Sequence, residues 1–326
     1  MTPALVQKLR CPRCRSDSPL ESTFTALNRE EIESGALTCT ACREEYAIEE
    51  GIADLLGSHS AVVRGERAVY RGSKIQVEDR LRSLDPAARD LELRRIAFME
   101  HTGEQFRLTS SLNLQGVLDR VSPRPGQWLI ELGAGSGWLT ARWAALGLHC
   151  VAVDISADLK LDLSPLVMSR EGVFFDRLMA DMTNLPIRTG AMDWVFVSAS
   201  LHHAASLSDS LREAARVLAP EGTLVVIDQA AEETPGLHER SFTYLQWRRA
   251  LRSAGVRPEF MFPAYYQAIL SGTASLPVAS RRFAWLAQVA WRSRLRGLLL
   301  SRPVQTAARV LLGLNVCMMA RKTGDS

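Results

Sequence analysis

The sequence has no uninterrupted apolar run that approaches the ~20 residues needed by a membrane-spanning helix. Its first ten residues also lack the apolar core of a secretory signal, so we expect a protein of the cytoplasm. The sequence also lacks a large excess of positive or negative charge. Its formal net charge is only +3, which by itself gives no argument for nucleic-acid binding. The 326 residues, 47% of them hydrophobic, are enough for one large globular domain and a small module.

Cysteine is sparse, and four of the six cysteines form two C-x-x-C pairs within the first 57 residues. In a reducing compartment such pairs favour a metal over disulfides. Each C-x-x-C turn directs two thiolates at one point, and four thiolates complete a closed tetrahedral zinc site. We therefore predict a zinc ribbon over residues 1–57 that gains much of its folding free energy from the metal. The alternative is two redox-active or disulfide pairs. The predicted zinc ligands are Cys11, Cys14, Cys39 and Cys42.

The residues around these pairs carry a resemblance. Segments 9–14, 37–42 and 51–56, the last reading G-I-A-D-L-L, resemble the zinc-ribbon family of activators of tRNA methyltransferases. The resemblance covers nearly the whole ribbon. It leaves the role of the ribbon open, because such modules serve as partner surfaces, as RNA contacts or as structural caps.

A turn with glycine at every second position follows the apolar segment 128–132 and precedes a helical pattern that begins at Trp138. Such a turn lets a ligand lie directly against the backbone and the helix N-terminus. A dinucleotide-binding fold requires G-x-G-x-x-G, and here the third glycine comes one residue early. The glycines are Gly133, Gly135 and Gly137.

The segment E-L-G-A-G-S-G resembles the first motif of the class I S-adenosylmethionine-dependent methyltransferases, E/D-x-G-x-G-x-G. Asp154 ends the next buried segment, about 20 residues beyond the turn, where a carboxylate can bind both hydroxyls of a ribose; the alternative is a helix N-cap. The resemblance places Asp181 and Met182, in the run D-M-T-N-L-P, at the adenine edge. The implied cofactor contacts are Glu131, Gly133, Ala134, Gly135, Gly137, Asp154, Ile155, Asp181, Met182 and Ser198.

Strands and helices alternate along the second half of the chain. We predict strands at 128–132, 150–154, 174–179, 192–198, 223–228, 260–262 and 314–320. This order predicts an α/β fold: a Rossmann-like, doubly wound, mostly parallel seven-stranded sheet that gathers ligands at the carboxyl ends of its strands. The methyltransferase domain is expected over residues 109–326, after a helical connector over 58–108.

A helical insertion is predicted at about 263–313, and it contains seven arginines and no acid. Basic amphipathic helices of this kind can lie on an anionic membrane surface, here through the arginines of 281–302. They can also form a lid over an apolar substrate, contact an RNA backbone, or pack on the sheet with a solvated arginine face. The connector, likewise, either carries substrate contacts or packs the ribbon onto the large domain.

Two histidines, His202 and His203, follow the fourth strand of the large domain, near the expected position of the methyl group. Methyl transfer from a sulfonium is an in-line displacement, so alignment is the main task of the enzyme. A general base is needed only where the nucleophile carries a proton that is hard to lose, and either histidine could accept it, with His202 the first to test. The alternative is a structural role for this turn. Tyr265 and Tyr266 are weaker candidates for the acceptor pocket.

Taken together, these patterns predict an S-adenosylmethionine-dependent methyltransferase with a structural zinc ion, acting on a small molecule, a glycan or a lipid intermediate. The alternative is an RNA-base methyltransferase that uses the ribbon to recognise rRNA or tRNA, by analogy with bacterial rRNA guanine enzymes that also carry a zinc ribbon. A third hypothesis is a non-catalytic binding module. The intact glycine turn and Asp154 argue against it.

Overall fold

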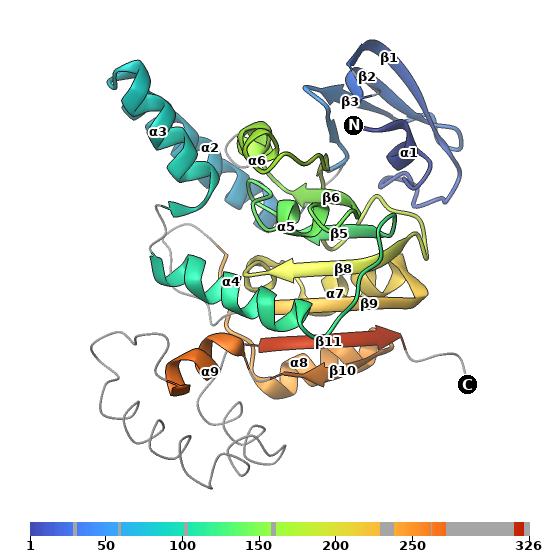
Figure 1. Cartoon of the computed structure of the whole chain (residues 1–326). Helices are drawn as coiled ribbons and strands as arrows, with labels where there is room; N and C mark the ends of the chain where they lie inside the picture. The colour runs from blue at the N-terminus through green and yellow to red at the C-terminus, as the bar shows by residue number, and fades with distance from the viewer. Residues whose placement is uncertain are drawn as a thin grey trace, which may run out of the picture.

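The computed structural model describes residues 1–28, 31–57, 60–100, 104–157, 161–228, 238–261, 263–271 and 316–322. Their strands form one 11-stranded sheet in the order β1-β2-β3-β4-β7-β6-β5-β8-β9-β11-β10. Figure 1 shows this sheet running through the centre of the molecule, with the ribbon strands at one end and β10 at the other. Each of the seven strands predicted for the large domain has a counterpart in it.

Five strands of the large domain are parallel and buried, which explains why apolar residues dominate in most of them. β11 then lies antiparallel between β9 and β10. The doubly wound, Rossmann-like α/β fold is thus confirmed. The seven strands are β5 (Trp128–Leu132), β6 (His149–Asp154), β7 (Asp176–Met179), β8 (Met192–Ser198), β9 (Leu218–Asp228), β10 (Val256–Phe260) and β11 (Val316–Lys322).

The ribbon strands continue the same sheet instead of forming a sheet of their own. β4 pairs in parallel with β7, with Ile52 opposite Arg177 and Asp54 opposite Met179. The seven strands of the large domain are mostly parallel, as predicted, with four of their six neighbouring pairs parallel. The whole sheet has more strands than the predicted seven and is mixed, because the ribbon joins it and five of the ten neighbouring pairs are antiparallel. The ribbon strands are β1 (Leu20–Asn28), β2 (Glu31–Cys39), β3 (Glu45–Glu49) and β4 (Ile52–Asp54).

Helices cover both faces of the large-domain sheet (Figure 1). α4 (Glu104–Leu118), α5 (Thr140–Ala144) and α6 (Ser164–Glu171) lie on one face, and α7 (Leu207–Val217) and α8 (Tyr244–Ser253) lie on the other.

The hydrophobic core on the α7 and α8 face continues into the ribbon. It joins Leu37 and Ile48 of the ribbon to Val151 of β6 and Leu211 of α7, all of them fully buried. The ribbon and the large domain therefore share one core on this side of the sheet.

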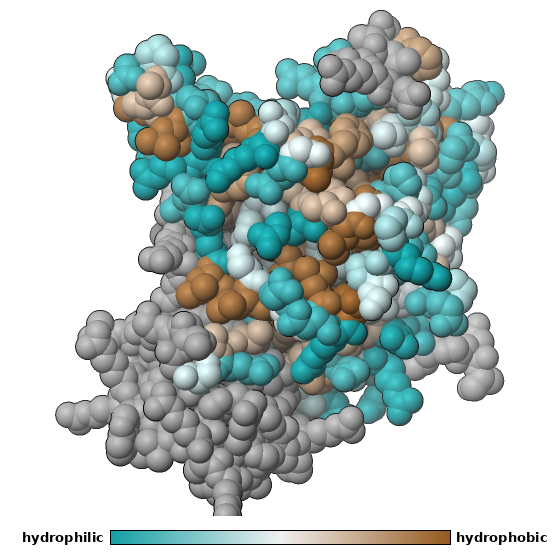
Figure 2. Space-filling model, viewed as in Figure 1, coloured by the Kyte–Doolittle hydropathy of each residue, from teal (hydrophilic) through white to brown (hydrophobic). Residues whose placement is uncertain are grey.

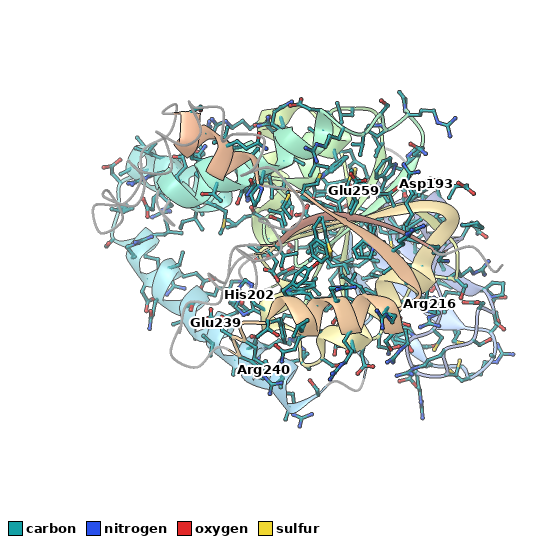
Figure 3. All side chains as sticks on the ribbon, turned by 90° about the horizontal axis from the view of Figure 1, so that it is seen from below. Asp193, His202, Arg216, Glu239, Arg240 and Glu259 are labelled. Atoms are coloured by element: carbon teal, nitrogen blue, oxygen red, sulfur yellow. The ribbon has the colours of Figure 1, made fainter. Side chains whose placement is uncertain are left out.

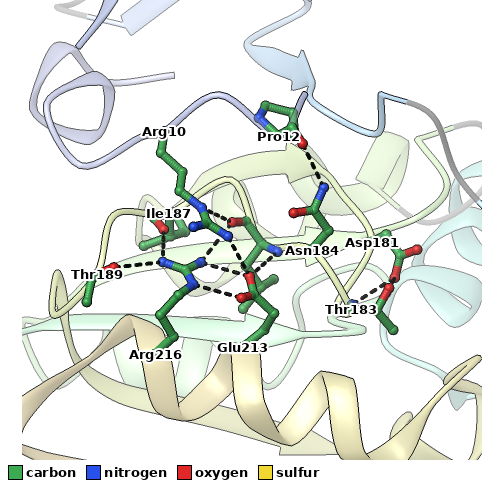
Figure 4. Close-up of polar contacts among 10 residues, drawn as sticks. Arg10, Pro12, Asp181, Thr183, Asn184, Ile187, Thr189, Glu213 and Arg216 are labelled. Atoms are coloured by element: carbon green, nitrogen blue, oxygen red, sulfur yellow. Dashed lines mark hydrogen bonds and ion pairs between the residues drawn. The ribbon is translucent and has the colours of Figure 1, made fainter. Parts of the chain in front are cut away.

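A buried ionic joint also ties the ribbon to α7. The guanidinium of Arg10 lies 3.0 Å from Glu213, and Glu213 also accepts hydrogen bonds of 2.7 and 2.8 Å from Arg216. Beside it, the side-chain amide of Asn184 donates to the carbonyl of Pro12 at 2.9 Å (Figure 4). The side chains of Arg10 and Glu213 are only 7% and 16% exposed, so this joint is shielded from solvent.

The beginning of the chain, leading into α1 (Pro3–Val6), is held between β2 and β7. The ammonium group of Met1 donates to Glu31 at 2.9 Å and to the carbonyl of Ile32 at 3.0 Å. The amide and hydroxyl of Thr2 both donate to the carboxylate of Asp176, at 2.6 and 2.8 Å. Burial raises the pKa of Asp176 to about 6, and the two bonds from Thr2 offset this only in part.

The connector forms two helices, α2 (Ala61–Arg82) and α3 (Pro86–Ala97). Asp85 caps α3 by accepting hydrogen bonds of 3.0 Å from the amides of Ala87 and Ala88, and Pro86 occupies the first helical position. Figure 2 shows the α2–α3 pair and the ribbon as two separate projections of the surface.

Most of the predicted insertion, including the arginines of 281–302, lies outside the described residues. The backbone of α9 (Ala264–Ser271) is described, but the side chains of Tyr265 and Tyr266 are not. No helix in the described ranges is long and apolar enough to cross a bilayer.

Candidate cofactor site and metal centre

The two C-x-x-C turns of the ribbon bring four sulfur atoms together. The Sγ atom of Cys11 lies 3.6 Å from that of Cys42, and the Sγ atom of Cys14 lies 3.7 Å from that of Cys39. All four sulfur atoms lie within 4.8 Å of one another. Four Zn–S bonds of about 2.3 Å in a tetrahedron require sulfur atoms about 3.8 Å apart, so the cluster fits a zinc ion. All four cysteines are free thiols, which argues against the disulfide alternative.

The two turns have the same backbone conformation, as expected for a pair that shares one metal. In each, the amide after the second cysteine donates to the carbonyl of the first at 2.9 Å: Arg15 to Cys11, and Arg43 to Cys39. Both arginines have positive φ, 57° and 62°. The two C-x-x-C turns are therefore matched in conformation. Their four thiolates would hold zinc as a purely structural ion.

The three glycines after β5 meet different demands, although all have positive φ. A Cβ atom on Gly133 would lie 2.4 Å from the Cβ atom of Ser200, and one on Gly137 would lie 2.4 Å from the ring of Phe175. Nothing lies within 4 Å of a Cβ atom built on Gly135. Packing of the protein on itself therefore requires the outer two glycines, whereas the space beside the middle one is open to a ligand.

Asp154 ends β6 directly opposite this turn. Its carboxylate accepts hydrogen bonds from the amide of Gly135 at 2.9 Å and from the amide of Ser156 at 3.2 Å. The residue is only 3% exposed. Two backbone amides thus fix the carboxylate beside the open face of the glycine turn, where the sequence predicts the ribose contact.

A pocket lies at the carboxyl ends of β5, β6, β7 and β8, covered by α2. Its cavity volume is about 40 Å³, well below the ~300 Å³ at which ligand pockets begin. A nucleoside therefore fits only if α2 or the neighbouring loops move outward. The lining residues are Val63, Glu66, Tyr70, Gly133, Val153, Asp154, Ile155, Ala180, Asp181, Met182, Ser200, His203, Ala204 and Ala205.

The turn after β8 carries the two predicted histidines in a short 3-10 helix, η3 (Leu201–His203). Ala199, just before it, has φ +48°. The hydroxyl of Ser200 donates to the carbonyl of Leu132 at 2.7 Å and so fixes this turn to the end of β5.

The two histidines differ in exposure. The side chain of His202 is 6% exposed, and its Nδ1 atom lies 2.8 Å from Asp228 at the end of β9. The side chain of His203 is 19% exposed and lines the pocket, and its Nδ1 atom lies 3.2 Å from Glu66 of α2. His203 can therefore meet a molecule in the pocket directly, whereas His202 stands behind it.

The structure brings only part of the predicted site to the pocket wall. Gly133, Asp154, Ile155, Asp181, Met182 and His203 line it. Six other predicted site residues do not line the pocket: Glu131, Ala134, Gly135, Gly137, Ser198 and His202.

Glu131 is the clearest departure from the predicted arrangement. The residue is 2% exposed, and it accepts a hydrogen bond from the hydroxyl of Thr140 in α5. Burial raises its pKa to about 8, with the bond from Thr140 acting in the opposite direction. Its carboxyl group is therefore largely protonated near neutral pH, and it serves the contact between strand and helix in this structure.

The sequence missed several residues at the pocket. Glu66 and Tyr70 lie in the middle of a long connector helix, where no local pattern marks them. Asp228, which contacts His202 behind the pocket, did carry a signal, since an acid at the carboxyl end of a parallel strand is the same feature that singled out Asp154.

A larger groove of about 1000 Å³ lies at the opposite, amino end of the parallel strands, beside β10 and β11. Its lining includes Arg257, Glu259 and Lys322. None of the predicted site residues reaches it, so the chemistry points to the smaller pocket.

Comparisons with known proteins identify families that match the two parts of the chain. Residues 130–226 match the family described as "Methyltransferase domain", and residues 3–51 match "Trm112p-like protein". A demethylmenaquinone methyltransferase of Renibacterium salmoninarum is 30% identical over 176 residues, which cover 54% of this chain and 70% of the relative.

Other relatives are matched over a smaller share of their length. A demethylmenaquinone methyltransferase of Corynebacterium urealyticum is 34% identical over 119 residues, 36% of this chain and 48% of the relative. Among solved structures, a complex of the Haloferax volcanii Trm112 methyltransferase activator with a methyltransferase shares 18% identity. The match covers 64% of this chain and 88% of that one at a TM-score of 0.44, a similarity too low to support any argument.

Proposed function

Because this chain belongs to the S-adenosylmethionine-dependent methyltransferases, we propose that it transfers the methyl group of this cofactor to a small molecule or a lipid intermediate. The single observation that carries the proposal is the pocket at the carboxyl ends of the parallel strands, where Asp154, Asp181 and His203 meet. The relatives named demethylmenaquinone methyltransferase favour an acceptor of this class over a glycan.

We assign the cofactor contacts as follows. Asp154 binds the two ribose hydroxyls, since its carboxylate is already fixed by two amides beside the turn. Asp181 accepts from the exocyclic amine of adenine, and Met182 lies against the ring. Gly135 leaves the space in which the cofactor approaches the backbone.

The cofactor, when bound, supplies an activated methyl group. The protein then has to align the acceptor with it and exclude water. His203 is the proposed catalytic residue because it lines the pocket, while Glu66 holds its Nδ1 atom and leaves Nε2 for the acceptor. His202, buried on Asp228, is a positioning residue.

A second function is RNA-base methylation, favoured by the Trm112p-like match over residues 3–51. The charge of the ribbon argues against it. Residues 1–57 contain six basic and ten acidic side chains, a formal net charge of −4. A surface of that sign repels a phosphate backbone, so we rank RNA below the small-molecule acceptor.

A lipid acceptor would also give a role to the arginines of 281–302, as a peripheral contact with an anionic membrane. The expected result is association of the protein with anionic vesicles that is lost when these arginines are replaced by glutamine. Association that persists in the glutamine variant would contradict this part of the proposal.

The acceptor class can be tested with cofactor labelled in the methyl group. Purified protein is incubated with a fractionated bacterial extract, and the label is measured separately in lipid, RNA, protein and small-molecule pools. We expect label in the lipid or small-molecule pool. Label confined to RNA, together with salt-sensitive retention on nucleic acid, would establish the second function instead.

A further inference from the structure

The two histidines of η3 are each anchored by a carboxylate through the same ring atom. Nδ1 of His202 lies 2.8 Å from Asp228, and Nδ1 of His203 lies 3.2 Å from Glu66. Their rings lie side by side, with centroids 4.2 Å apart. A carboxylate on Nδ1 is the usual partner of a histidine that binds a metal through Nε2, because it fixes the tautomer and the ring orientation.

A third donor stands next to the pair. The Oε1 atom of Glu239 lies 3.9 Å from Nε2 of His203. One ligand atom from each of His202, His203 and Glu239 lies within 4.8 Å of the other two. Figure 3 shows His202 and Glu239 next to each other, far from Arg216.

These separations are close to those of a formed metal site. Bonds of about 2.1 Å from one cation to three donors place the donors about 3.0–3.6 Å from one another. The 3.9 Å between Nε2 of His203 and Oε1 of Glu239 is close to this range. Side-chain movements that shorten the longest separation, which is within 4.8 Å, by about 1 Å would close the site around an ion.

We propose that His202, His203 and Glu239 bind a divalent transition-metal cation, oriented by Asp228 and Glu66. Two imidazoles and one carboxylate suit Mn²⁺, Fe²⁺, Co²⁺ or Zn²⁺ and leave positions open for a further oxygen ligand. Since His203 also lines the cofactor pocket, the ion lies at the border between cofactor and acceptor. This inference rests on the proposed function only for the role of the ion. That role is to bind an oxygen atom of the acceptor and lower the pKa of the group that carries it. With the ion bound, Nε2 of His203 is a ligand and no longer accepts a proton from the acceptor, so both histidines act on the acceptor only through the ion.

The test uses the full chain supplied with one equivalent of zinc, which the four thiolates of the ribbon bind in preference to the imidazoles and carboxylate. The protein is then titrated with Mn²⁺ and followed by electron paramagnetic resonance of the free ion. Mn²⁺ favours nitrogen and oxygen over thiolate ligands, so it does not compete for the four cysteines. We expect one Mn²⁺ bound per chain. Replacing His203 by alanine or Glu239 by glutamine is expected to weaken binding by at least about 10-fold.

His149→Ala is the matched control, because this histidine lies at the start of β6, stacked on Trp128 with ring centroids 4.9 Å apart. It should leave Mn²⁺ binding unchanged. Asp228→Asn retains the volume of the side chain and should weaken binding without removing a ligand. Melting temperatures of all variants verify that each is folded.

Two outcomes would overturn the inference: wild-type protein that binds no Mn²⁺, or folded His203→Ala and Glu239→Gln variants that bind it as well as wild type does. Calorimetry with S-adenosylhomocysteine separates this result from the proposed function. Protein that binds the nucleoside but not Mn²⁺ retains the function and loses the metal site; protein that binds Mn²⁺ but not the nucleoside retains the metal site and loses the function.

Discussion

The carboxylate of Asp154 and the backbone amide of Gly135 are joined by a hydrogen bond of 2.9 Å. This bond ties the acid that ends β6 to the middle glycine of the turn that follows β5. The two parts of the cofactor motif, 19 residues apart in the sequence, therefore hold each other in place before any ligand arrives.

Asp154→Ala should weaken binding of S-adenosylhomocysteine by about 100-fold, since two charge-assisted hydrogen bonds to the ribose are lost. Calorimetry measures the affinity. Asp79→Ala, which removes a carboxylate exposed on α2, is the control and should change nothing. Unchanged affinity in the Asp154 variant would show that the ribose lies elsewhere.

Gly135→Ala and Gly172→Ala form a matched pair. Both glycines have positive φ, +59° and +65°, and neither would place a Cβ atom within 4 Å of another group. Each substitution should lower the free energy of unfolding by about 1–2 kcal/mol through backbone strain. Only the Gly135 variant should also lose cofactor affinity, and equal affinities in the two variants would contradict the assignment of the turn.

Purified protein should contain one zinc ion per chain by elemental analysis. Cys39→Ser should lose that ion and lower the melting temperature, because the metal supplies folding free energy. Cys150→Ala, which changes a buried thiol outside the ribbon, should retain it. Zinc below about half an equivalent in folded wild-type protein would count against the metal centre.

Arg10→Ala should destabilise the protein by about 3 kcal/mol, because it leaves the largely buried carboxylate of Glu213 without one of its partners. The exposed pair of Arg212 and Asp209 provides the comparison. Arg212→Ala should cost less than about 1 kcal/mol. Urea unfolding measures both, and equal costs would mean that the joint between ribbon and α7 adds no more than a surface ion pair.

The buried carboxyl group of Glu131 predicts a pH dependence of stability. Its pKa is raised from 4.5 to about 8 by burial, so the folded state keeps a proton that the unfolded state has lost between these values. The free energy of unfolding therefore falls as pH rises from 4.5 to 8, by up to about 1.4 kcal/mol per unit. Glu131→Gln should remove most of this slope in melts at pH 6.5, 7, 7.5 and 8, a range above the pKa of about 6 of Asp176, whereas Glu259→Gln, on the exposed side of β10, should not. An unchanged slope in Glu131→Gln would show that the carboxyl group is already ionised when folded.

The sequence was sufficient for features that local pattern determines. The glycine turn, the acids at strand ends and the C-x-x-C pairs each depend on only a few neighbouring residues, and Asp154 and Asp181 line one pocket at the strand ends. Their contacts with a cofactor stay a prediction. The bond between Asp85 and the start of α3 was equally readable, because a cap depends only on its immediate neighbours.

Features that depend on distant segments could not be read. β4 is three residues long, and its partner β7 follows it by more than 100 residues, so nothing near Ile52 indicates a continuous sheet. Glu66 reaches His203 across 137 residues for the same reason. The motif also misled at Glu131, since an acid in a glycine-turn motif looks like a ligand contact whether it faces the pocket or a helix.

The pairing of β4 with β7 has a consequence for truncated forms of the protein. In a sheet of seven strands, β7 would be an edge strand with one row of backbone amides and carbonyls unpaired. Such an edge can pair with a strand of another chain. In the full chain, β4 of the ribbon pairs with this edge. A chain shortened to residue 58 onward would expose it, and self-association of that fragment, rather than simple loss of zinc, is the first defect to expect.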